Sequence, residues 1–113
     1  MMPMIGYSQL MKDIFNVDKD SVEMMLKSLA KHKPTELRMK VLYGLAKTEE
    51  STISALLKMA GENNTGGTYK TIHSFFRTLE KDCLLCSQRR GYREYWRFTE
   101  KAKDLQIYLN NSD

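Results

Sequence analysis

The segment CLLCSQRRGYREYWRFTEKA, residues 83–102, holds two runs rich in strand-favouring residues on either side of one glycine. The runs LLCSQ (84–88) and YREYWRF (92–98) predict a two-stranded hairpin that turns at Gly91. Side chains alternate along a strand, so Trp96 and Phe98 should share one face, and Arg93, Tyr95 and Arg97 the other. A hairpin turn does not require three arginines around its glycine. The role of Arg89, Arg90 and Arg93 is therefore a question about function.

A helix is predicted directly before this hairpin, over residues 68–82. Its sequence, TYKTIHSFFRTLEKD, has apolar residues at helical spacing, and Thr65 to Thr68 offer several residues that can cap its start. The side chains expected to point inward are Ile72, Phe75, Phe76 and Leu79. Those expected to point largely outward are Lys70, Thr71, Ser74, Arg77 and Thr78.

Five other helices are expected. A short one covers residues 7–15, and the next begins at Asp20, where Glu23 completes a capping box, and ends near residues 31–33. Pro34 suits the first turn of a third helix, whose buried stripe is Leu37, Val41, Leu42 and Leu45. Ser51 or Thr52 caps a fourth over residues 52–60, which Gly61 ends. After the hairpin, Thr99 caps a last helix over residues 100–109.

Composition limits the possible classes of protein. The 113 residues suffice for one compact domain, and 42% apolar with 28% charged residues is typical of a globular chain. No apolar run is long enough for a membrane span, and no secretory signal is evident, so a cytoplasmic protein without a membrane partner is expected. The net charge of +4 is concentrated in residues 67–98, which hold seven basic and three acidic residues. Such a segment is typical either of a surface that meets phosphates or of a solvated basic face.

Catalytic and metal-binding patterns are missing from the sequence. Cys83 and Cys86 form a CxxC pair, but a zinc ribbon needs a second pair, and residues three apart on one strand point to opposite faces. Both are therefore expected to be ordinary buried thiols. His32 and His73 lie in separate predicted helices, and no catalytic triad or phosphate loop appears. We expect neither an enzyme nor a bound metal or cofactor.

Three stretches resemble a known family: STISALLKMAG (51–61), TYKTIHSFFRTLEKDCLL (68–85) and YWRFTEKAKDL (95–105). They are similar to winged helix-turn-helix proteins of the MarR, ArsR and PadR type over residues 34–109. The chain departs from the family at Cys83 and Ala102, where glycine is usual, and in a longer turn at residues 61–67. The resemblance implies a mainly α (α+β) winged helix-turn-helix with a two-stranded β-hairpin wing and extra N-terminal helices. Residues 1–33 would be a helical extension that packs on the core or on a dimer partner, and residues 34–113 the DNA-binding domain.

The resemblance also implies a set of DNA-binding residues. Lys70, Thr71, Ser74 and Arg77, with Thr68, Tyr69 and His73, would form the base-reading face of the second helix. Lys70 or Arg77 would pair with guanine, and Thr68 and Ser74 would more often touch phosphate. Arg89, Arg90 and Arg93 would contact DNA from the wing, with the ring of Tyr92 beside them. Ser51 and Thr52, at a helix start, would hold a phosphate through backbone N–H groups.

Plainer roles stay open for three of these residues. Tyr69 also suits packing under the first turn of its helix, and His73 suits a solvated surface. Arg77 also suits an ion pair with Glu80.

The expected function is a DNA-binding transcriptional regulator, with a repressor as the favoured type and double-stranded DNA as the partner. An architectural, plasmid-partition or replication protein that spreads along DNA is one alternative. A winged-helix module that binds protein is another. A homodimer is expected, because DNA half-sites repeat about one helical turn apart. The methionines of the N-terminal region could either make the dimer contact or cover the core. They are Met1, Met2, Met4, Met11, Met24 and Met25. The expected location is the cytoplasm, at the nucleoid.

Overall fold

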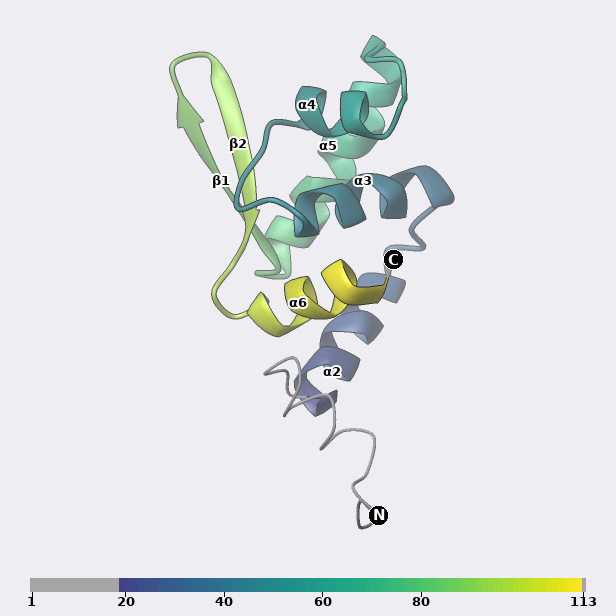
Figure 1. Ribbon diagram of the computed structural model, residues 1–113, viewed down its shortest axis with the longest axis vertical. Coiled ribbons are helices and arrows are strands. Elements are labelled where there is room, and N and C mark those ends of the chain that lie inside the picture. The colour runs from purple at the N-terminus through teal and green to yellow at the C-terminus, as the bar shows by residue number, and fades with distance from the viewer. Residues whose placement is uncertain (1–18, 113) are drawn as a thin grey trace.

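The computed structural model describes residues 19–112. These residues form five helices and one antiparallel hairpin, arranged as in Figure 1. In chain order they are α2 (Lys19–Ala30), α3 (Glu36–Ala46), α4 (Ile53–Met59), α5 (Gly66–Lys81), β1 (Leu85–Arg90), β2 (Arg93–Phe98) and α6 (Lys103–Ser112). The predicted class, mainly helical with a two-stranded hairpin, is confirmed. The predicted helix over residues 7–15 lies outside the described residues, as do Met1, Met2, Met4 and Met11.

The core is built from α5, the inner face of the hairpin and the helices packed against them. All four α5 side chains predicted to point inward are buried. The ring of Trp96 is fully buried and meets that of Phe76 edge-on, with the ring centroids 5.3 Å apart. Burying a phenylalanine contributes about 1.5–3 kcal/mol relative to leaving it exposed. The contact between these rings therefore holds the hairpin against α5.

Hydroxyl side chains cap the two helices before the hairpin. Thr52 accepts a hydrogen bond from the backbone N–H of Ala55 at 3.2 Å, and Thr65 accepts one from Thr68 at 3.2 Å. Each hydroxyl satisfies an N–H group that has no partner within its helix. Gly61 follows the end of α4 with a φ of +73°, the left-handed conformation that ends a helix at little cost for glycine. The predicted start and end of α4 are thus confirmed.

Three predicted helix starts and one buried position were wrong. Asp20 lies inside the first turn of α2, where its negative charge interacts favourably with the positive end of the helix dipole. Pro34 lies before α3, because Thr35 is the residue that caps it. Thr99 accepts from the N–H of Ala102, yet α6 begins only at Lys103, after a tight turn. In α3 the side chain of Leu37 is only half-buried, because it lies in the first turn, away from the centre of the core.

The first strand extends two residues further toward the turn than predicted, to Arg90, whereas the second begins at Arg93, one residue later than predicted. Leu85 pairs with Phe98 at one end and Arg90 with Arg93 at the other, and Gly91 has a φ of +65°. On the other edge of β2, the backbone of Ser51 exchanges two hydrogen bonds with that of Trp96, at 3.0 and 2.7 Å. The chain just before α4 is therefore fixed beside β2.

The two cysteines do not match their prediction as buried thiols. Cys83 is exposed, because it lies in the turn between α5 and β1 rather than on a strand, and Cys86 is half-buried. Cys83 has a φ of +63°, a conformation that favours glycine.

The helix α2 packs at the opposite end of the molecule from the hairpin turn (Figure 1). It contributes Met25 and Leu29 to the main core, and Val22 packs against Ile107 and Tyr108 of α6. Near its C-terminus, His32 lies 2.7 Å from a carboxylate oxygen of Asp82, which caps α5. Within residues 19–112 no helix is long and apolar enough to span a membrane.

Candidate nucleic-acid interface

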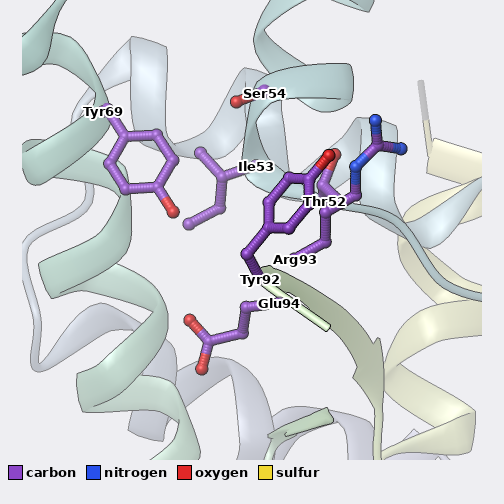
Figure 2. Close-up of a pocket in the computed structure, with 7 residues that line it drawn as sticks. All are labelled: Thr52, Ile53, Ser54, Tyr69, Tyr92, Arg93 and Glu94. Carbon is purple, nitrogen blue, oxygen red and sulfur yellow. The ribbon is translucent and has the colours of Figure 1, made fainter. Parts of the chain in front are cut away.

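A groove of about 430 Å³ lies between the start of α4, the first turns of α5 and the hairpin turn. In Figure 1 the hairpin turn and α4 lie at the end of the molecule opposite α2. Figure 2 shows the seven residues that line the groove, which are Thr52, Ile53, Ser54, Tyr69, Tyr92, Arg93 and Glu94. Four of the predicted DNA-binding residues, Thr52, Tyr69, Tyr92 and Arg93, thus line one surface although they come from three separate elements.

The solvent-facing side of α5 carries polar groups from its first turn onward. Lys70 and Ser74 are exposed and lie one turn apart, and the hydroxyl of Thr71 donates to the carbonyl of Gly67 at 3.0 Å. Thr68 is half-buried and accepts a hydrogen bond from the hydroxyl of Thr65 at 2.9 Å. Among the described residues, the ammonium group of Lys70 has no ion-pair partner. A cation and hydroxyl groups therefore face solvent on this side of α5.

A polar network ties α5 to the hairpin beneath this surface. The guanidinium group of Arg77 donates to Glu94 of β2 at 2.6 Å and to Glu80 of its own helix at 2.7 Å. His73 lies 3.2 Å from the other carboxylate oxygen of Glu94. Ser87 of β1 donates to Glu80 at 3.0 Å. The side chain of Glu94 is only 10% exposed, so its charge depends on these partners.

The electrostatics of the network keep Glu94 ionised. Burial alone would raise the pKa of Glu94, but hydrogen bonds from Arg77 and His73 and the charge of Arg77 together hold it below its usual value. The hydrogen bond to Glu80, and then that to Glu94, raises the pKa of Arg77 despite its partial burial. The guanidinium group also lies 5.0 Å from the centroid of the Trp96 ring. Arg77 is thus held in a fixed position between α5 and β2.

These contacts assign Arg77, His73 and Tyr69 to the molecule's own structure. Arg77 pairs with Glu80, as its plainer role predicted, and with Glu94 in addition. Tyr69 is half-buried, and its ring stacks on that of His73 with centroids 5.8 Å apart. Whether these three residues also contact DNA stays a prediction.

The three arginines around the hairpin turn do not form one cluster. In the register of the hairpin, Arg89 lies opposite Glu94 and shares the face that carries Trp96, whereas Arg90 lies opposite Arg93 on the other face. Arg89 has no ion-pair partner among the described residues. Arg93 lies over the exposed ring of Tyr92, at 5.9 Å from its centroid.

Arg90 is the hairpin arginine with a firm partner. Its two terminal nitrogens donate to the two carboxylate oxygens of Glu50, at 2.5 and 2.8 Å. Its guanidinium group lies 4.8 Å from the centroid of the Tyr95 ring. Arg90 therefore lies along the outer face of the hairpin toward the segment before α4.

The two residues predicted at the start of α4 differ in what they offer. Ser51 is buried, and its N–H group is engaged by the carbonyl of Trp96. Thr52 is half-buried, lines the groove and uses its hydroxyl to cap α4.

Two acidic residues of this surface were not foreseen. Glu94 lies two and four residues before Trp96 and Phe98 along β2, so the strand period could have placed it on their inner face. Glu50 carried no such signal, because its partner Arg90 is 40 residues away in the sequence.

No cluster of three or more histidine, cysteine or acidic residues suited to a metal ion occurs within residues 19–112. Comparison with known proteins finds no match to family models, to curated proteins or to solved structures. Function therefore has to be inferred from the residues themselves.

Proposed function

We propose that the chain is a winged helix-turn-helix protein that binds double-stranded DNA as a homodimer and regulates transcription, as a repressor. In this proposal α4 and α5 are the helix-turn-helix, α5 enters the major groove, and the hairpin is the wing on the flanking backbone. One arrangement supports it above all. The first turns of α5, which carry Lys70, and the hairpin turn, which carries Arg93, border the same groove.

The dimensions and chemistry of this end agree with a DNA contact. The 16 residues of α5 make a helix about 24 Å long, and the major groove, about 12 Å wide, admits a helix. Lys70 can donate to guanine, and Thr71 and Ser74 can bond to base edges or phosphates. Arg89 and Arg93 carry the phosphate contacts of the wing. Arg77 receives no base contact in this proposal, because it holds the wing against α5.

A salt titration of DNA binding tests the proposal. Binding to a fluorescently labelled random duplex is measured by anisotropy for the wild type and for the double variant Arg89→Ala/Arg93→Ala. Each lost phosphate contact reduces the slope of log K against log salt by about 0.9, so the double variant should lose about 1.8. The control Lys27→Ala/Lys101→Ala removes the same charge at two exposed positions away from the groove, one on α2 and one just before α6. This control should keep the slope of the wild type.

The same measurements separate the alternatives. Wild-type protein that fails to bind DNA even at low salt would overturn the proposal and favour a protein-interaction module. If DNA is bound, a footprint of constant length as protein concentration rises supports a regulator with a defined operator. A footprint that lengthens with concentration supports an architectural or partition protein instead.

A further inference from the structure

The outer face of the hairpin carries an arginine, Arg90, whose two terminal nitrogens are both engaged by a carboxylate. Both terminal nitrogens of Arg90 donate to Glu50, and one of them also donates to the amide oxygen of Gln88 at 3.0 Å. The ring of Tyr95 lies beneath the guanidinium group. Arg90 is thus fixed by contacts from three residues, in an orientation along the strand face.

Glu50 is held in this position by the backbone of its neighbour. Ser51 pairs with Trp96 through two backbone hydrogen bonds, which fixes the adjacent residue beside β2. The hydrogen bond from Arg90, together with the charges of Arg90 and Arg97, lowers the pKa of Glu50. Glu50 is therefore an anion at neutral pH, and its partner is an arginine of the surface assigned to DNA.

A carboxylate and a phosphate compete for the same arginine. Both accept two parallel N–H groups from the guanidinium fork, in nearly the same geometry. A DNA phosphate can reach this fork only if Glu50 leaves it. The negative charge of Glu50 also repels a phosphate that approaches Arg90.

We propose that Glu50 limits the affinity of the chain for DNA, because its carboxylate occupies the guanidinium group of Arg90 in place of a backbone phosphate. Of the three arginines around the hairpin turn, only Arg89 and Arg93 then contact DNA. This inference rests on the proposed function and names a residue that regulates the strength of that contact.

The test compares two glutamates that are adjacent in the sequence. Glu50→Gln and Glu49→Gln make the same change in net charge, but Glu49 is exposed and has no arginine partner among the described residues. Salt titrations of binding to a random duplex are run for both, and for Arg90→Ala in the wild-type and the Glu50→Gln backgrounds. Circular dichroism checks that all four variants are folded.

Releasing Arg90 should add one phosphate contact. Relative to Glu49→Gln, the Glu50→Gln variant should steepen the slope of log K against log salt by about 0.9 and bind about eightfold more tightly near 0.1 M salt. Arg90→Ala should leave the slope of the wild type unchanged, and should remove the gain in the Glu50→Gln background.

Other results would overturn the inference without touching the proposed function. If the two glutamine variants bind alike, Glu50 does not withhold a phosphate contact. If Arg90→Ala reduces the slope of the wild type by about 0.9, Glu50 already releases Arg90 when DNA binds. Failure of the proposed function has a separate signature, since the wild type would then bind no DNA at all.

Discussion

The network that joins Arg77 to Glu94 should be a major source of the stability of the hairpin. Replacing Arg77 with methionine removes the guanidinium group but keeps an unbranched stem against Trp96. Glu94, only 10% exposed, would keep His73 as its remaining partner from α5. Removing one partner of a fully buried ion pair costs about 3–5 kcal/mol. Since Arg77 is itself 39% exposed and water can replace part of its contacts, we expect a loss of about 2 kcal/mol.

The assay is urea unfolding followed by fluorescence, because Trp96 is the only tryptophan of the chain and lies in the core. The exposed Arg93→Met variant is the matched control and should change the free energy of unfolding by less than about 0.5 kcal/mol. In the double variant Arg77→Met/Glu94→Gln no buried charge is left unpaired. Its loss should therefore be smaller than the sum of the two single losses, by about 1–2 kcal/mol.

The effect should also depend on pH. The folded protein holds the pKa of Glu94 below its usual value, so the unfolded chain binds the proton more readily. The contribution of the pair is then complete above about pH 4.3, the ordinary pKa of glutamate, and disappears as the pH falls through the lower folded value. A loss below about 0.5 kcal/mol for Arg77→Met, or strictly additive single losses, would refute the reasoning.

Two further changes test the structure at the base of the hairpin and at α2. Cys83→Gly should stabilise the protein by about 0.5–1 kcal/mol in thermal unfolding under reducing conditions, because a φ of +63° is strained for cysteine, and a lower Tm would contradict this. Asp82→Asn should lose about 1 kcal/mol near neutral pH, because this carboxylate accepts from Ser28 at 2.9 Å and lies 2.7 Å from His32. The hydrogen bonds from His32 and Ser28 lower the pKa of Asp82, so the difference from wild type should vanish as pH falls through that pKa, and a difference that persists would argue against the pairing.

Much of the fold was predictable because its main signals are local. The buried stripe of α5 follows the helical period, and Trp96 and Phe98 follow the strand period, so both were found from spacing alone. Gly61 and Thr52 mark the ends of α4 for reasons that act within one or two turns.

The errors arose where the conformation depends on distant contacts or on the backbone. The CxxC spacing assumed that Cys83 lies on a strand, but the turn between α5 and β1 places it in the left-handed region and in solvent. Pro34 was expected in the first turn of α3, but the helix begins only at Glu36, because the side chain of Thr35 caps it by accepting from the backbone N–H of Arg38. Such choices are settled by which donor and acceptor meet in the folded chain.

In the candidate site, too, local signals were predictable and contacts between distant residues were not. The charge of residues 67–98 could be counted from the sequence, and an ion pair of Arg77 with Glu80 was considered, but the pairs of Arg77 with Glu94 and of Arg90 with Glu50 were not foreseen. Their partners differ in kind, since Glu94 belongs to the hairpin itself and Glu50 comes from the segment before α4. Arg77 joins the hairpin to α5, and Arg90 joins it to the segment before α4. Among the arginines around the hairpin turn, Arg89 and Arg93 have no ion-pair partner within the described residues. The Arg77 pair, with Glu94 only 10% exposed, is the stronger restraint on the hairpin, because an exposed pair such as Arg90 with Glu50 contributes little.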